Sequence, residues 1–168
     1  MKTLLAYGTR YGATSTTAKE IGRVLNEKGF DVKVADAKKE KIRDITQYEL
    51  VVIGTGLQFG RWTGEVEWFL KKNQKTLADK KVAIFVSTMK SLLEREGKTK
   101  QLIGDRKMEL DNKVAKYSFN PVSLGFFGGI IDFSKMNLLT RRMGGSLKQR
   151  LEKAGFREAA PGVYELRD

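Results

Sequence analysis

The first 28 residues constrain the fold most strongly. Residues 2–7 (KTLLAY) form a short apolar run typical of a buried β-strand, and residues 14–28 carry a helical pattern. The turn between them is rich in glycine and hydroxyl groups. A strand that enters a helix through such a turn presents free N–H groups and the positive end of the helix dipole to the loop. The opening of the chain therefore predicts an anion site.

The hydroxyl groups of this turn indicate which class of anion it binds. They add donors to the backbone N–H groups, whereas lysine contributes little to this segment. This combination favours a permanently bound phosphate monoester over a triphosphate that is hydrolysed. The hydroxyl donors are Thr9, Thr14, Ser15, Thr16 and Thr17.

The rest of the chain repeats the alternation of strand and helix. Further strands are expected at residues 30–37, 49–54, 81–87 and 121–127, a helix at 63–77, and a short helix or loop at 38–47. Continuous apolar runs in the central strands indicate a parallel sheet covered on both faces, in one domain spanning residues 1–168. Ligands of such sheets bind at the carboxyl ends of the strands. Three loops leave those ends: residues 8–14, residues 54–63 and the region after Ser87.

The second of these loops, residues 54–64, contains four glycines and two aromatic residues, Phe59 and Trp62. Glycine lets the backbone approach a ligand closely, and aromatic rings stack on planar groups. The loop as a whole predicts a planar ligand. For Trp62 alone, the alternative that its ring folds back onto the core is slightly favoured.

These two loops resemble those of the flavodoxin family. The segment Thr9 to Thr14 resembles the flavodoxin phosphate loop, [ST]-x-[ST]-G-x-T, and departs from it at Tyr11 and at Ala13, where flavodoxins often carry Asn. The pair Phe59-Gly60 is similar to the pair that stacks on the flavin and offers a backbone group to its N5. The resemblance implies a flavodoxin-like α/β fold: a three-layer, doubly wound sandwich with a five-stranded parallel sheet that binds FMN.

Within that family, the chain is most similar to the menaquinone-dependent protoporphyrinogen oxidases. These basic proteins begin with a T-R-x-G-x-T loop, as Thr9 to Thr14 does here, and have an I-G-x-x-x-x-[FY]-G loop, as in Ile53 to Gly60. They also carry an insertion after the fourth strand and an M-x-G-G element that is similar to Met143-Gly144-Gly145. The resemblance covers roughly residues 1–150. It implies oxidation of a porphyrinogen-like substrate with a quinone as acceptor.

The resemblance also implies which residues bind the cofactor. The first loop would hold the phosphate, the second would flank the isoalloxazine with Phe59 stacking and Gly60 near N5, and residues after the fourth and fifth strands would close the pocket. No side chain is expected to act as an acid or base, because the flavin carries the redox chemistry. The expected residues are Thr9, Arg10, Tyr11, Gly12, Ala13, Thr14, Thr55, Gly56, Leu57, Gln58, Phe59, Gly60, Arg61, Trp62, Ser87, Thr88, Met89, Gly128 and Gly129.

Two basic segments remain. Residues 89–120 form the insertion, which is interpreted either as a solvated helix pair or as a flap that recognises anionic groups near the flavin. Residues 134–153 are basic and amphipathic, a pattern that suits either an anionic membrane surface or a helix that covers the sheet. The second interpretation is preferred because the sheet needs a cover. Gly144-Gly145 is expected to divide this segment into two short helices.

The composition of the chain excludes several kinds of cross-link, metal site and catalytic mechanism. The chain has no cysteine and no histidine, which removes disulfides, Cys/His metal sites and histidine-dependent nucleophilic catalysis. The absence of an N-terminal leader pattern and of a long apolar span favours the cytoplasm, with peripheral membrane contact as an option. The net charge of +12 indicates an anionic partner.

Three functions compete at this point. The first is an FMN oxidoreductase that passes electrons from a small molecule to a quinone. The second is a flavodoxin that carries single electrons between redox proteins, for which the basic charge would require acidic partners. The third, a nucleic-acid-binding domain, explains the charge but not the glycine-aromatic loops, so nucleic acid is the least expected partner. The sequence leaves the oligomeric state open.

Overall fold

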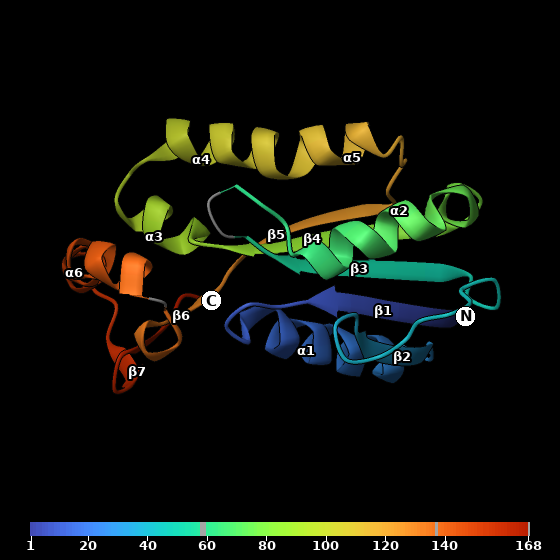
Figure 1. The fold of residues 1–168 in the computed structure, drawn as a ribbon, viewed down its shortest axis with the longest axis horizontal. Helices are drawn as coiled ribbons and strands as arrows, with labels where there is room; N and C mark the ends of the chain where they lie inside the picture. The colour runs from blue at the N-terminus through green and yellow to red at the C-terminus, as the bar shows by residue number, and fades with distance from the viewer. Residues whose placement is uncertain (58–59, 137, 168) are drawn as a thin grey trace.

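The computed structural model describes residues 1–57, 60–136 and 138–167, with the backbone alone for residues 138–143. Five parallel strands form the main sheet in the order β2-β1-β3-β4-β5, as Figure 1 shows. This order confirms the predicted flavodoxin-like sheet. The strands are β1 (Lys2–Gly8), β2 (Asp31–Asp36), β3 (Leu50–Gly56), β4 (Lys81–Thr88) and β5 (Ser123–Gly128).

Helices cover both faces of this sheet. On one face, α1 (Ala13–Glu27) packs Ala18 against Leu5, Val52 and Phe85 of three strands. On the other face, α2 (Gly64–Ala78) packs over β1, β3 and β4 (Figure 1), and Leu110, Val114 and Tyr117 of the segment after β4 join the same core cluster. The central strand β3 is buried along its whole length. Its uninterrupted apolar sequence therefore reflects cover on both faces.

The sequence left two connections open, one between β2 and β3 and one between β4 and β5, and the structure resolves them differently. Residues 37–49 contain no helix; they run as turn and loop and place Ile45 and Tyr48 in the core beside α2. The segment between β4 and β5 is helical. It consists of α3 (Lys90–Arg95), α4 (Thr99–Arg106), a single π-helical turn (Lys107–Asp111) and α5 (Asn112–Lys116).

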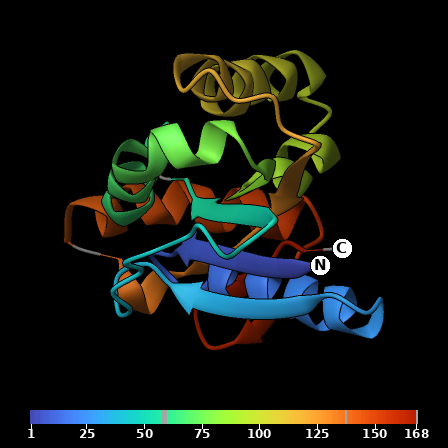
Figure 2. The ribbon, with the colours of Figure 1, turned by 90° about the vertical axis from the view of Figure 1, so that its right-hand side faces the viewer.

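The chain after β5 forms a separate small unit. Strands β6 (Ile130–Asp132), β7 (Glu158–Ala160) and β8 (Val163–Glu165) make a three-stranded antiparallel sheet in the order β6-β8-β7. A 3₁₀ turn (Phe133–Lys135) and α6 (Leu138–Lys153) connect β6 to β7. Figures 1 and 2 show α6 lying across the carboxyl ends of the main strands.

This position corrects the expectation that residues 134–153 cover a face of the main sheet. Leu147 and Leu151 pack instead with Ile131, Tyr164 and other residues of the small unit. The small sheet supplies the apolar cover that α6 requires, and Phe127 on β5 stays 41% exposed. No helix in the described part of the chain combines the length and the apolar character needed to cross a bilayer.

The glycine pair in α6 corrects a second expectation, because the helix continues through Gly144 and Gly145 without a break. Gly144 is buried, and a Cβ atom there would lie 3.1 Å from Cε1 of Phe133. Gly144 therefore allows the helix to approach Phe133 closely, and packing outweighs the low helix propensity of glycine.

A prediction follows for Gly128, which lies between the main sheet and the small unit. A Cβ atom at Gly128 would lie 1.9 Å from the carbonyl oxygen of Leu166 and 2.7 Å from Oγ of Ser91. We expect Gly128→Ala to lower the free energy of unfolding by about 1–3 kcal/mol, since the backbone must shift to relieve the overlap. Urea unfolding measures the change. Gly145→Ala is the matched control, because Gly145 has no atom within 4 Å of its Cβ position; equal stabilities of the two variants would contradict the prediction.

Candidate flavin site

A pocket of about 500 Å³ lies at the carboxyl ends of the main strands, between the loops of the sheet and the small unit. Its size is in the range of small-molecule sites. The predicted residues that line it come from all three expected loops and from the end of β5. They are Thr9, Arg10, Tyr11, Ala13, Thr14, Gly56, Leu57, Ser87, Thr88, Met89 and Gly129.

The first loop is shaped for an anion. Gly12 takes a left-handed conformation (φ 96°) immediately before α1, and its N–H donates to Oγ1 of Thr9 at 2.9 Å. Because the Thr9 oxygen accepts this bond, its own O–H proton remains available to a ligand. The first turn of α1 contains no acidic residue, so the helix itself places no carboxylate at the positive end of its dipole.

The second and third loops bring further polar groups to the same place. Gly56 lies against the first loop, where a Cβ atom would be 3.1 Å from Oγ1 of Thr14. The hydroxyl of Ser87, at the end of β4, lines the pocket, is buried and has no hydrogen-bond partner among the described residues. A buried polar group without a partner is costly. The Ser87 hydroxyl thus requires a partner that a polar ligand can supply.

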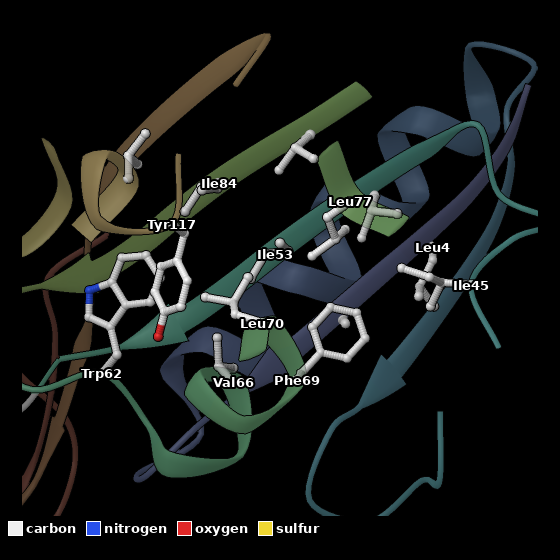
Figure 3. Packing of buried hydrophobic residues seen from close by; sticks show 14 of the residues in the cluster. Leu4, Ile45, Ile53, Trp62, Val66, Phe69, Leu70, Leu77, Ile84 and Tyr117 are labelled. Atoms are coloured by element: carbon white, nitrogen blue, oxygen red, sulfur yellow. The ribbon is translucent and has the colours of Figure 1, made fainter. Parts of the chain in front are cut away.

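Trp62 does not line the pocket, contrary to the expectation that it contacts the flavin. Its ring is 2% exposed and lies in the core beside Tyr117 and Val66, as Figure 3 shows. Its Nε1 donates to the carbonyl oxygen of Glu109 at 2.6 Å. Trp62 therefore fastens the π-helical turn to the core, and the alternative that its ring folds inward describes the structure.

Of the remaining residues that were expected to bind the flavin, those that the structure describes do not line the pocket. Thr55 is buried, and its Oγ1 accepts the N–H of Thr63 at 3.1 Å, which fixes the start of α2. Gly12 shapes the first loop, Gly128 makes room for Leu166, and the exposed Arg61 and the neighbouring Gly60 are not among the lining residues. Gln58 and Phe59 lie outside the described residues. Arg10 connects the two loops, since its Nη2 donates to the carbonyl oxygen of Trp62 at 3.3 Å.

The small unit supplies a wall of the pocket that the sequence patterns did not predict. As far as its side chains are described, this wall is mostly apolar and includes the cation Arg150. The additional lining residues are Ile130, Ile131, Met136, Gly144, Ser146, Leu147 and Arg150. The signal available in the sequence was the amphipathic pattern of residues 134–153, but a pattern gives the apolar side of a helix without saying what that side faces.

A bidentate ion pair holds this wall in place. Nε and Nη2 of Arg150 donate to the two carboxylate oxygens of Glu96 at 2.7 and 2.6 Å. These bonds, together with Lys98, lower the pKa of Glu96 to about 2. Arg95 adds a second connection, because its guanidinium lies 3.8 Å from the ring centroid of Phe156. The segment after β4 and the small unit are thereby joined along one side of the pocket.

Glu109, in the π-helical turn, has the opposite pKa shift. Burial, with a smaller contribution from Asp105, raises the pKa of Glu109 to about 7. The folded protein therefore keeps this carboxyl protonated at pH values where the unfolded chain has ionised it. By linkage, the contribution of Glu109 to stability falls as the pH rises from about 4.5 through 7.

We expect Glu109→Gln to flatten this dependence. The free energy of unfolding of the wild type should lose about 1 kcal/mol more between pH 5 and pH 8 than that of the variant, after allowance for solvent screening. Urea unfolding at pH 5, 6, 7 and 8 measures the difference. Glu94→Gln, at an exposed carboxylate, is the control. Parallel pH profiles of wild type and Glu109→Gln would contradict the assignment.

Comparison with known proteins places this architecture in a class. A flavodoxin domain profile matches residues 4–154. A flavodoxin from the domain Archaea superposes with a TM-score of 0.55 at 18% identity, covering 76% of this chain and 85% of that one. Flavodoxin 1 from Bacillus cereus superposes with a TM-score of 0.55 at 17% identity, and the match covers 91% of this chain and 98% of that one. The chain belongs to the flavodoxin family, whose cofactor is FMN.

A group of relatives matched by sequence carries the name of one particular enzyme. Protoporphyrinogen IX dehydrogenase [quinone] of Escherichia coli K12 is 31% identical over 77 residues. That match covers 46% of this chain and only 42% of the relative, well under half of its length. The same 31% identity is found with the protein of that name from Escherichia coli O157:H7.

Proposed function

We propose that this chain is an FMN-dependent oxidoreductase that acts on a small molecule. The observation that carries the proposal is the composition of the pocket wall. Beyond the loops that suit a phosphate and a flavin, the small unit adds the apolar side chains of Ile131, Met136 and Leu147 and the cation Arg150. A site that served only the cofactor would not need this second wall.

The residues of the pocket fit FMN in three respects. Thr9, Thr14 and the N-terminus of α1 would hold the phosphate through hydroxyl and backbone donors. Ser87, whose hydroxyl has no partner in the described part of the chain, would donate to a polar atom of the cofactor. Gly56 and Leu57 would border the ring system, and Phe59 is proposed to stack on it. When bound, FMN supplies the transfer of electrons or hydride.

The chain's own residues would position a substrate and limit water. Met136 and Leu147 would pack on an apolar ring system, and Arg150, whose charge is balanced by Glu96, would donate a hydrogen bond to a carboxylate or a carbonyl oxygen of it. Together with the name of the Escherichia coli relatives, this supports a porphyrinogen-like donor and a quinone acceptor. The cationic surroundings would stabilise reduced, anionic flavin and so raise its potential.

A second candidate is a carrier of single electrons between redox proteins. Met89 favours it, because this residue lines the pocket and is 39% exposed. The surroundings of a bound cofactor thus reach the surface, where a partner protein could dock. Turnover distinguishes the two candidates, since a carrier exchanges electrons with a protein partner and does not convert a small substrate.

The test begins with the visible spectrum of the purified protein and extraction of its cofactor. A yellow protein that releases FMN one-to-one supports the proposed site. Anaerobic assays with protoporphyrinogen and a menaquinone analogue then follow, and multiple turnovers support the oxidoreductase. Flavin that is reduced and reoxidised only by redox proteins would favour the carrier, and a colourless protein that fails to bind FMN at micromolar concentration would refute both.

A further inference from the structure

A second hollow lies away from the flavin pocket, between the loop after β2 and helix α2. It has a volume of about 520 Å³ and is lined by residues 37–43 on one side and by Trp68 and Lys72 on the other. We call it the Trp68 groove. Nothing in the proposed FMN site uses these residues.

The groove is strongly cationic. Its lining contains one carboxylate, that of Glu40, and this group is already paired with Lys33 at 3.4 Å. Among the described residues, Lys38, Lys41 and Arg43 form no ion pair, and all three are exposed. The lining cations are Lys38, Lys39, Lys41, Arg43 and Lys72. Lys39 is paired with Asp36 at 3.9 Å, which leaves the other lining cations in excess of the nearby carboxylates. Like charges in excess repel each other, so an anionic partner relieves their repulsion.

An exposed aromatic ring forms one wall. Trp68 is 59% exposed, although the other tryptophan of the chain, Trp62, is 2% exposed. Lys72 fixes this wall, because its Nζ lies 5.0 Å from the Trp68 ring centroid and donates to the carbonyl oxygen of Ile42 at 3.3 Å. Tryptophan is among the residue types that are enriched at interaction hot spots.

We propose that the Trp68 groove binds an acidic segment of a partner protein, with carboxylates against Lys38, Lys41 and Arg43 and an apolar side chain against Trp68. The hollow shape favours a chain segment over a bilayer, whose flat surface cannot enter it. The single aromatic ring favours a peptide over single-stranded nucleic acid, which needs stacking platforms for successive bases.

Trp68 also reports the binding. Because Trp62 is buried, a ligand in the groove changes chiefly the emission of Trp68. The probe is the peptide acetyl-EDELEDE-amide, added to the purified protein in whatever flavin state it is isolated. We expect a saturable change in emission, and a dissociation constant that rises with salt because charged groups are paired. The peptide acetyl-EDESEDE-amide, without the apolar side chain, should bind more weakly.

Charge reversal locates the site. Lys38→Glu combined with Lys41→Glu and Arg43→Glu should raise the dissociation constant roughly tenfold to a hundredfold, given roughly twofold to fivefold for each exposed charge pair. The matched control reverses Lys100, Arg106 and Lys107, three exposed cations elsewhere. Circular dichroism and urea unfolding check that both triple variants fold. Trp68→Gln, which lacks the reporter ring and is therefore measured by isothermal titration calorimetry, should weaken binding of acetyl-EDELEDE-amide without changing that of acetyl-EDESEDE-amide.

The outcomes separate this proposal from its rivals and from the FMN site. Equal weakening by both triple variants, or no saturable binding, overturns the proposal. Tighter binding to poly-U RNA or to phosphatidylglycerol vesicles than to the peptide, at equal charge concentration, also overturns it and identifies the other partner class. Because the readout needs neither bound FMN nor turnover, failure of the proposed function leaves the result unaffected.

Discussion

Thr14→Val should weaken FMN binding roughly tenfold to a hundredfold. Thr14 is 1% exposed, lines the pocket, and lies at the start of α1, where the proposed phosphate site is. Valine keeps the shape of threonine but removes the hydroxyl donor. A hydrogen bond to a charged group contributes roughly 1.5–3 kcal/mol, which corresponds to that range of affinity. Quenching of flavin fluorescence during titration of the apoprotein measures the dissociation constant.

Two comparisons make this prediction specific. Riboflavin lacks the phosphate, so its affinity should be nearly the same for wild type and Thr14→Val. Thr16→Val is the matched control, because Thr16 lies in the same turn of α1 but is exposed and is not among the lining residues. If riboflavin loses affinity as much as FMN does, Thr14 acts on the shape of the pocket and not on the phosphate.

Trp62→Ala should lower the free energy of unfolding by about 3–5 kcal/mol, because it empties a large volume in a close-packed core. The same change removes the hydrogen bond from Nε1 to the carbonyl oxygen of Glu109. That bond connects the start of α2 to the π-helical turn, so we also expect residues 107–116 to lose protection. Urea unfolding measures the first effect and amide hydrogen exchange the second.

Trp62→Phe separates the two contributions. Phenylalanine retains most of the apolar packing with Val66 and Tyr117 but cannot donate to Glu109, so the loss should be smaller, about 1–3 kcal/mol. Exchange protection of the π-helical turn should still fall. A variant Trp62→Ala as stable as the wild type would mean that the ring does not occupy the core position seen in Figure 3.

Local patterns were sufficient to predict the main sheet. The apolar runs of residues 2–7 and 49–54 could only be buried strands, and the turn from Thr9 to Thr14 had to enter a helix, because strand period, helix period and turn residues are all encoded by neighbouring residues. The anion-binding shape of the first loop follows from the same local facts. Its glycine and threonine act on groups a few residues away, as the bond from Gly12 to Thr9 shows.

Contacts between distant segments could not be predicted in this way. Trp62 and Phe59 have the same aromatic character in the same loop, and only the packing of residues 107–117 shows that the Trp62 ring points into the core. Similarly, the amphipathic pattern of residues 134–153 shows that the helix needs an apolar partner surface, but it does not show which segment of the chain provides that surface. The small sheet after β5 provides that surface, and it does so because Gly128 lets Leu166 approach the end of the main sheet.

The sequence by itself therefore determined the parallel main sheet, the loops at the carboxyl ends of its strands and the cationic character of the chain. The tertiary structure decided which wall closes the pocket, which aromatic ring is buried and which cations gather around Trp68. The physical reason is the range of the interactions. Hydrogen-bond patterns and turn conformations depend on neighbours along the chain, whereas burial and charge clustering depend on residues that folding brings together from distant positions.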